Sequence, residues 1–367
     1  MVLNRENSDV SLHSNFVPLM SENEQPVRPF LHTCLRGAYF ALPSILMGQV
    51  LAVLLAGTGA CNGLLAENNY SLPLFQNLWH YLLLSLLFAP FAFHRLKQSL
   101  SYHSFYAKCR SDWWKYLLAS GLDVHANWAI VVAYSYTNVV SIQVLDCLSI
   151  ASCMVLSRFI FKVAYKASHV LAILGCLGGM SLMIWADHEQ ETSKNITLLS
   201  NATDSNKSNI SRALIGDIIV VFSALAYGGS NVIQEYLSRK NGSFSYLAIS
   251  SLIAVVFQTC YFFTFEYRES NLQMLRNMNS VSIGSLVGYV LIMTVLYVCM
   301  SFMLPILHAV FTNLSMLTAD FYALLLGLFL FKSVFTWQYL VAFFIIIISV
   351  VMFTLRPPKE RQTIQSS

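Results

Sequence analysis

Ten separate apolar stretches, each about as long as a membrane span, set the strongest constraint on how this chain can fold. A helix needs about 20 predominantly apolar residues to cross the hydrocarbon core of a bilayer. Inside that core the backbone must satisfy its own hydrogen bonds, so each stretch is expected to be helical. The stretches cover residues 37–58, 73–94, 115–136, 139–162, 167–186, 213–237, 244–265, 281–303, 309–331 and 336–355. The sequence therefore predicts an all-α membrane protein with ten transmembrane helices.

The composition leaves little room for a separate soluble domain. Apolar residues make up 56% of the chain and charged residues only 11%, whereas soluble domains carry about 25% charged residues. We expect a disordered cytosolic tail over 1–34, a first five-helix repeat over 35–186, a non-cytosolic loop over 187–212, a second five-helix repeat over 213–355 and a cytosolic tail over 356–367. The chain contains no P-loop, no HExxH and no CxxC, so we expect no enzyme activity, no cofactor, no metal site and no nucleic-acid partner.

The lysines and arginines predict the orientation in the membrane. With the N-terminus in the cytosol, sixteen of the 22 would lie on the cytosolic side and six on the other, which is the bias that cytoplasmic loops show. Both termini are then cytosolic. The loop 187–212 falls on the other side, where glycosylation occurs, and it carries four Asn-x-Ser/Thr sequons. Their acceptors are Asn195, Asn201, Asn206 and Asn209.

Two acidic residues occupy corresponding places in the two halves of the chain. Asp146 lies in the run 139–162 and Asp320 in the run 309–331, and each run ends on a similar aromatic segment followed by lysine. Each half has five spans, an odd number, so the second half should be inverted relative to the first. Inverted repeats around a central cavity are a transporter architecture. A charged residue in mid-membrane is costly and is a functional hypothesis by default.

The third span carries a polar stripe at helical spacing. We interpret the stripe as one wall of a solute pathway, with hydrogen bonding between helices as the alternative. His125 lies on another side of the same helix. The stripe consists of Ser120, Asp123, Asn127, Tyr134 and Asn138.

The fourth and ninth spans each add an amide to their acid. Gln143 shares a face with Asp146, and Asn313 shares one with Asp320. We expect these four side chains to line the same pathway, and the alternative is again a structural bridge between helices.

Three further acids lie near the ends of predicted spans. Asp217 is expected in the first turn of its helix, where a negative charge suits the helix dipole. Glu67 and Glu235 follow the apolar parts of the first and sixth spans. They are expected to be solvated or, as the alternative, to act as a gate. Two Gly-xxx-Gly motifs, beginning at Gly59 and Gly284, and a glycine cluster at 175, 178 and 179 favour close helix packing inside the bundle, with a homodimer as the alternative.

Several segments resemble one known family. Gln143–Cys147, Leu214–Ile218 with Ser230–Tyr236, and Leu317–Tyr322 with Gly327–Phe331 are similar to the F subgroup of solute carrier family 35, in the drug/metabolite transporter superfamily. The resemblance runs from about Gly48 to Thr354. It implies ten helices in two inverted repeats around a substrate cavity. The subgroup pattern differs at four positions, having Glu at 125, Pro at 151, Trp at 158 and an acid at 234, where this chain has His125, Ala151, Arg158 and Gln234.

The sequence thus predicts a secondary transporter of a small organic solute that works by alternating access. The resemblance implies a nucleobase-, nucleoside- or nucleotide-sugar-like metabolite. The alternatives are a membrane scaffold or receptor without transport and, third, a channel. The lipid bilayer is the other expected partner. Both the plasma membrane and an endomembrane fit the sequence.

Overall fold

The computed structural model describes residues 30–68, 70, 72–98, 102–133, 136, 145–196, 206–330, 337–355 and 359–360. Some residues in these ranges are described by backbone only: 30–41, 67, 91–98, 102–110, 183–184, 186–196, 206–213, 272, 320, 324, 327–330 and 359–360. The chain divides into two compact units, residues 1–40 and 41–367. Of the first unit, only the beginning of a helix, residues 30–40, is described.

The described residues are overwhelmingly helical, which confirms the all-α prediction. The helices are α1 (Phe30–Glu67), α2 (Pro73–Gln98), α3 (Tyr102–Ala133), α5 (Leu148–Ile160), α6 (Ala167–Ile196), α7 (Asn206–Asn241), α8 (Ser243–Tyr261), α9 (Glu269–Arg276), α10 (Ser280–Leu307), α11 (Ala309–Met316), α12 (Ala319–Leu330) and α13 (Trp337–Thr354). A π-helical turn, Phe262–Glu266, extends α8. Two short strands, β1 (Val163–Ala164) and β2 (Lys359–Glu360), pair antiparallel.

Six helices in the described part of the chain are long and apolar enough to cross a bilayer. They cover Leu42–Ala66, Ser111–Ala133, Leu214–Asn241, Ser243–Glu266, Ser280–Leu307 and Trp337–Thr354, and shorter apolar helices cover Leu148–Ile160 and Ala167–Leu182. The length and the apolar composition of these helices therefore identify the chain as a multi-pass membrane protein.

Two of the predicted spans differ from a single continuous helix. The run 309–331 is divided into α11 and α12 by a turn at Leu317 and Thr318. In the run 139–162, Leu145 and Asp146 are helical, Cys147 is a turn, and α5 begins only at Leu148. The physical cause is visible at Thr318, whose hydroxyl donates to the Ser315 carbonyl at 2.8 Å and to Gln49 Oε1 at 3.0 Å. A side chain that occupies a backbone acceptor in this way competes with the helical hydrogen-bond ladder.

The polar segment 187–212 is partly helical. The helix α6 continues to Ile196, and α7 begins at Asn206. Asn195, Asn206 and Asn209 therefore belong to helix ends, whereas Asn201 lies outside the described residues. Glycosylation of the four sequons stays a prediction.

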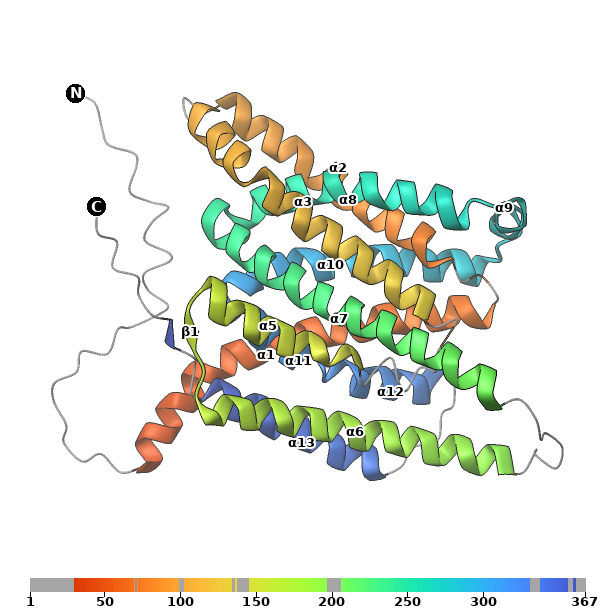
Figure 1. Ribbon diagram of the computed structural model, residues 1–367. Helices are drawn as coiled ribbons and strands as arrows, with labels where there is room; N and C mark the ends of the chain where they lie inside the picture. The colour runs from red at the N-terminus through yellow and green to blue at the C-terminus, as the bar shows by residue number, and fades with distance from the viewer. Residues whose placement is uncertain are drawn as a thin grey trace. The chain divides into compact units, whose positions relative to one another are not determined.

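Within the unit 41–367 the helices pack in three principal pairs. α3 lies along α7, α6 along α13, and α2 along α8 (Figure 1). The largest buried apolar cluster joins α5, α6, α11 and α13, and Ile150, Ile346 and Val350 in it are fully buried. In a bilayer the lipid tails are as apolar as these side chains, so close van der Waals packing and hydrogen bonds between helices, rather than a hydrophobic driving force, hold the helices together.

Glycines allow the closest helix approaches, at some of the predicted positions and elsewhere. A Cβ at Gly175 of α6 would lie 2.4 Å from Ser349 Oγ of α13, and a Cβ at Gly288 of α10 would lie 3.3 Å from Cys61 Sγ of α1. A Cβ at Gly228 of α7 would lie 2.5 Å from Ser152 Cβ and 2.7 Å from the Ser149 carbonyl oxygen of α5. A Cβ at Gly48 of α1 would lie 2.6 Å from Ser315 Cβ of α11. At Gly59 and Gly284 it would meet nothing within 4 Å.

The two ends of this unit differ in charge. At one end, the backbone N–H groups of Leu74 and Phe75 donate to the Glu266 carboxylate at 2.8 Å each, which caps α2. At the other end, Asp112 of α3 forms ion pairs with Lys115 at 2.8 Å and with Lys240 of α7 at 2.7 Å. The ends of α5 and α7 meet there too, since the Arg239 guanidinium lies 5.0 Å from the centre of the Phe161 ring.

Candidate functional site

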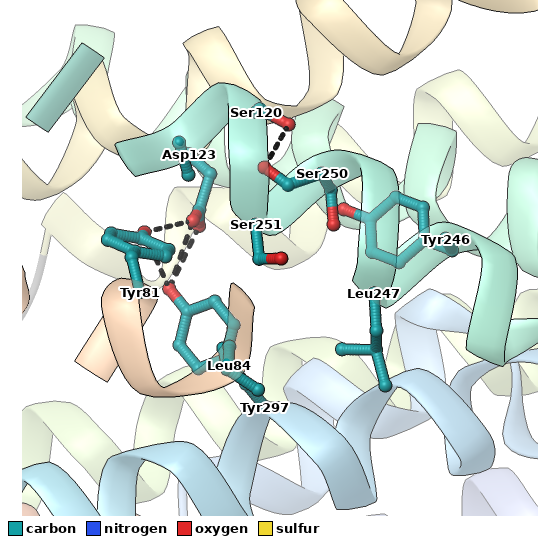
Figure 2. A pocket seen from close by; sticks show the side chains of 10 residues that line it. Tyr81, Leu84, Ser120, Asp123, Tyr246, Leu247, Ser250, Ser251 and Tyr297 are labelled. Atoms are coloured by element: carbon teal, nitrogen blue, oxygen red, sulfur yellow. Dashed lines mark hydrogen bonds between the residues drawn. The ribbon is translucent and has the colours of Figure 1, made fainter. Parts of the chain in front are cut away.

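The carboxylate of Asp123 is the centre of a polar cluster between three helices. The Tyr81 hydroxyl of α2 donates to Asp123 Oδ2 at 2.5 Å. The Tyr297 hydroxyl of α10 lies 3.0 Å from Oδ2 and 3.2 Å from Oδ1. Figure 2 shows both hydroxyls pointing at the carboxylate. Asp123 therefore ties α2, α3 and α10 together through hydrogen bonds to a charged group, which are about twice as strong as neutral ones.

A small cavity opens beside this carboxylate (Figure 2). Its volume is about 20 Å³, and a cavity needs about 10–15 Å³ to hold one water molecule. Pockets for small molecules usually measure about 300–1,000 Å³. The structure is thus closed around Asp123, with no room for an organic solute there. Its lining includes Ser120, Tyr246, Ser250 and Ser251 besides Asp123 and the two tyrosines.

The described residues of the polar stripe on α3 also contact neighbouring helices. Ser120 donates to the Ser250 carbonyl of α8 at 3.2 Å, and Asn127 Oδ1 accepts from the Tyr227 hydroxyl of α7 at 2.6 Å. Ser120 and Asn127 thus make hydrogen bonds between helices, while Ser120 and Asp123 also line the small cavity; a role of the stripe in a solute pathway stays a prediction. His125 lies exposed on another face, with its ring 5.3 Å from that of Tyr261.

Asp146 lies directly before the N-terminus of α5, at an interrupted span. Its Oδ1 atom is buried and has no hydrogen-bond partner among the described residues. Buried polar groups are nearly always hydrogen-bonded, so an unpartnered carboxylate oxygen needs an explanation.

Asp320 occupies the equivalent position in the ninth span. It is the second residue of α12, directly after the break at Leu317 and Thr318. Only its backbone is described. Asp320 therefore lies in the first turn of α12, where the helix dipole favours negative charge, whereas Asp146 lies two residues before the first residue of α5.

Gln49 of α1 forms hydrogen bonds to residues at the interruption between α11 and α12. Its Oε1 accepts from Thr318 at 3.0 Å and from Tyr322 at 2.8 Å. Its Nε2 is buried without a hydrogen-bond partner among the described residues. An unused amide donor and an unused carboxylate acceptor thus lie at the two helix interruptions, one on each.

Asn313 connects α11 to two other helices. Its Oδ1 accepts from Asn231 of α7 at 3.0 Å, and its Nδ2 donates to Cys153 Sγ of α5 at 3.3 Å. The predicted pathway residue is therefore engaged between α5, α7 and α11.

Glu235 is not solvated, contrary to the first expectation for it. Its side chain is fully buried, and its Oε1 pairs with Arg239 at 2.7 Å and with His308 Nδ1 at 2.9 Å. Its Oε2 accepts from the Ala309 backbone N–H at 2.7 Å, which caps α11. Glu235 lies inside α7, six residues before its end, so α7 and the α10–α11 junction close around it.

Asp217 is not in the first turn of its helix, and that prediction is wrong. The helix α7 begins eleven residues earlier, at Asn206, because polar residues extend it beyond the apolar run. The side chain of Glu67, at the end of α1, lies outside the described side chains, and Tyr134, Asn138 and Gln143 lie outside the described residues. In the described part of the chain no group of three His, Cys, Asp or Glu side chains could hold a metal ion.

The tyrosines are the residues that sequence reasoning missed. Tyr81 and Tyr297 bind Asp123, and the buried His80 ring packs against both, with ring centres 3.9 and 4.8 Å away. In an apolar run a tyrosine is usually interpreted as an ordinary core residue. A hydroxyl that must find a partner when buried was the only available signal.

Comparisons with known proteins agree on one family. The family model described as "Solute carrier family 35" matches residues 40–355. Solute carrier family 35 member F2 of Mus musculus is 32% identical over 89% of this chain and 82% of its own length. The Xenopus tropicalis protein of the same name is 32% identical over 85% and 76%. An uncharacterized family 35 member of Schizosaccharomyces pombe is 26% identical over 97% and 66%. A solved crystal structure is similar in fold alone, with TM-score 0.56 and 13% identity over 85% of this chain and 96% of its own.

Proposed function

Because this chain belongs to solute carrier family 35, we propose that it is a secondary transporter of a small organic solute rather than an enzyme. Ten membrane helices, arranged as two inverted five-helix repeats, would rock about a central site and expose it to one side at a time. The solute is a nucleobase-, nucleoside- or nucleotide-sugar-like metabolite.

The paired helix interruptions carry this proposal. In transporters with inverted repeats, the substrate site lies where discontinuous helices meet near the middle of the bilayer. Here α5 and α12 each begin at an interruption, and an acid lies beside each one: Asp146 two residues before α5, and Asp320 as the second residue of α12. Non-helical backbone at membrane depth is tolerated only where it is buried in protein or lines a cavity.

The unused polar atoms at the two interruptions support a binding role for them. Asp146 Oδ1 is an acceptor and Gln49 Nε2 is a donor, and both are buried without hydrogen-bond partners in the described part of the structure. A solute that offers both a donor and an acceptor, as a nucleobase or a ribose does, would satisfy them. Asp320 and Asn313 belong to the same proposed pathway.

The orientation with both termini in the cytosol is part of the proposal. The end of the unit that carries Arg158, Lys162, Arg239 and Lys240 would be the cytosolic end, in keeping with the excess of Lys and Arg on that side of membranes. The segment 187–212 would then be glycosylated outside the cytosol. A glycosidase-sensitive mass shift should vanish when Asn195, Asn201, Asn206 and Asn209 are all changed to Gln. Digestion of this segment in sealed microsomes from the cytosolic side would reverse the orientation.

Glu235 is proposed as part of the gate at that end. Its carboxylate joins α7 to the α10–α11 junction, so opening there requires that these contacts separate. In the inward-open state we expect the Ala309 N–H and the Glu235 carboxylate to part.

Uptake by purified protein in liposomes tests the proposal. A mixture of metabolites is offered outside, and the contents are identified by mass spectrometry. Accumulation of a solute that is lost in Asp146→Asn and kept in His125→Gln supports transport through the proposed site, since His125 lies exposed on the outer face of α3. Retention of every solute outside would favour a scaffold or receptor. Uptake without saturation or counterflow would favour a channel.

A further inference from the structure

A basic hollow lies at the C-terminal end of α5, apart from the proposed solute pathway. It has a volume of about 260 Å³ and is lined by Arg158, Lys162, Val163 and Ala164. The two cationic residues are exposed. Val163, the first residue of β1, is buried and forms the floor of the hollow.

The backbone at this place is fixed in an unusual shape. Arg158 lies in the last turn of α5, and Lys162 follows one turn later. Lys162 has φ 53°, in the left-handed region that residues other than glycine seldom adopt. The next two residues pair with β2, Val163 opposite Glu360 and Ala164 opposite Lys359. The pairing holds the chain in the conformation that puts both cationic side chains on one hollow.

The two positive charges are not neutralised by any described side chain. The ion pairs in the described part of the chain involve Asp112, with Lys115 and Lys240, and Glu235, with Arg239 and His308. Neither acid contacts Arg158 or Lys162. The carbonyl end of α5 favours nearby cations, but it leaves the hollow between them open. A guanidinium beside an ammonium is the combination that binds a phosphate group, by a bidentate contact and a point charge.

The surface that leads to the hollow is apolar. Phe159 is 74% exposed, and Val155 and Ile160 are also exposed on the outside of α5. In a multi-pass membrane protein such a surface meets acyl chains. An apolar strip that ends in a basic hollow between helix ends therefore suits a lipid, with its chains along α5 and its headgroup between the two cations.

We propose that the hollow binds the phosphate group of an anionic phospholipid at the membrane surface. The site is independent of whether the chain transports a solute. The hollow does adjoin the proposed gate. Phe161 lies between Arg158 and Lys162 in the sequence, and its ring packs against the Arg239 guanidinium. Arg239 in turn pairs with Glu235 of the proposed gate.

Native mass spectrometry of the full chain in detergent tests the proposal. Phosphatidylinositol, phosphatidylcholine and inorganic phosphate are added in turn, and bound molecules are counted. We expect phosphatidylinositol to remain bound and the double variant Arg158→Gln/Lys162→Gln to weaken its binding about 30-fold, as the loss of two cations at the membrane surface predicts. Lys166→Gln removes the same kind of charge four residues beyond Lys162, outside the hollow, and should change binding less than about twofold.

A charge-retaining variant separates binding from folding. Arg158→Lys/Lys162→Arg should keep most of the affinity if charge at the hollow is what matters. Equal loss in Lys166→Gln and in the double Gln variant would overturn the site. Equal binding of phosphatidylcholine, or displacement of the lipid by inorganic phosphate at similar concentration, would overturn the assignment to an anionic lipid.

Discussion

Asp123 and Asp146 are both carboxylates within the helical bundle, yet their surroundings are opposite. Asp123 accepts hydrogen bonds from two tyrosines on two other helices. Asp146 stands at a helix interruption and has a buried oxygen with no partner in the described structure. A carboxylate whose acceptors are filled by the protein holds helices together. One that keeps an acceptor unused is suited to a solute.

The largest expected effect is on transport through Asp146. Asp146→Asn keeps the size of the side chain and removes its charge, so a solute donor loses a charge-assisted hydrogen bond. We expect uptake by proteoliposomes to fall about 10- to 100-fold. The unfolding temperature should hardly change, because no protein hydrogen bond to Oδ1 is lost.

A matched measurement on the folded state decides this point. If Asp146→Asn lowers the unfolding temperature as much as Asp123→Asn does, Asp146 is a structural bridge and the contrast between the two acids disappears.

The second effect is on stability through Asp123. In Asp123→Asn one carboxylate oxygen becomes an amide donor, which faces tyrosine hydroxyls that were donating to it. We expect the free energy of unfolding to fall by about 2–3 kcal/mol, the usual value for hydrogen bonds to a charged group. Thermal unfolding in detergent measures it. If the variant is fully stable but has lost transport, Asp123 contacts the solute, as is proposed for Asp146, and is not a structural bridge.

The third effect concerns the helix that carries Asp146 at its N-terminus. Gly228→Ala puts a methyl group within 2.7 Å of the Ser149 carbonyl oxygen of α5, so α5 must shift. We expect a loss of about 1–3 kcal/mol from overpacking, together with reduced uptake. Gly59→Ala is the control, since its Cβ meets nothing within 4 Å; it should stabilise α1 by about 0.5–1 kcal/mol.

The smallest effect comes from a single tyrosine at Asp123. Tyr297→Phe removes one hydroxyl and leaves the Tyr81 hydrogen bond at 2.5 Å in place. We expect a loss of about 1–2 kcal/mol of stability, and saturable uptake with an unchanged half-saturation concentration. A changed half-saturation concentration would show that Tyr297 contacts the solute.

The sequence predicted the helices well because apolar length and backbone hydrogen bonding determine them locally. It also found Asp146 and Asp320 as a pair, because charge in an apolar run is conspicuous. It did not predict the interruptions beside them. No glycine or proline marks Leu317 and Thr318, and the side chain that contacts Thr318 at the break, Gln49, lies 269 residues earlier.

The partners of Asp123 were beyond the reach of the sequence for the same reason. Tyr81 and Tyr297 are 42 and 174 residues away from it, and only the tertiary fold brings them together. The error at Asp217 has a different origin: the apolar run marked the membrane-spanning part of α7, whereas the helix itself begins in polar sequence.

The junction between α10 and α11 consists of one residue, His308, with φ 66°. Around it a single carboxylate, Glu235, holds the start of α11, the imidazole of His308 and the end of α7 through Arg239. If any one of these three moves away, the buried Glu235 carboxylate loses a hydrogen bond or its ion pair. Movement at this end is therefore expected to be concerted, with a steep dependence on temperature and no half-open form that accumulates.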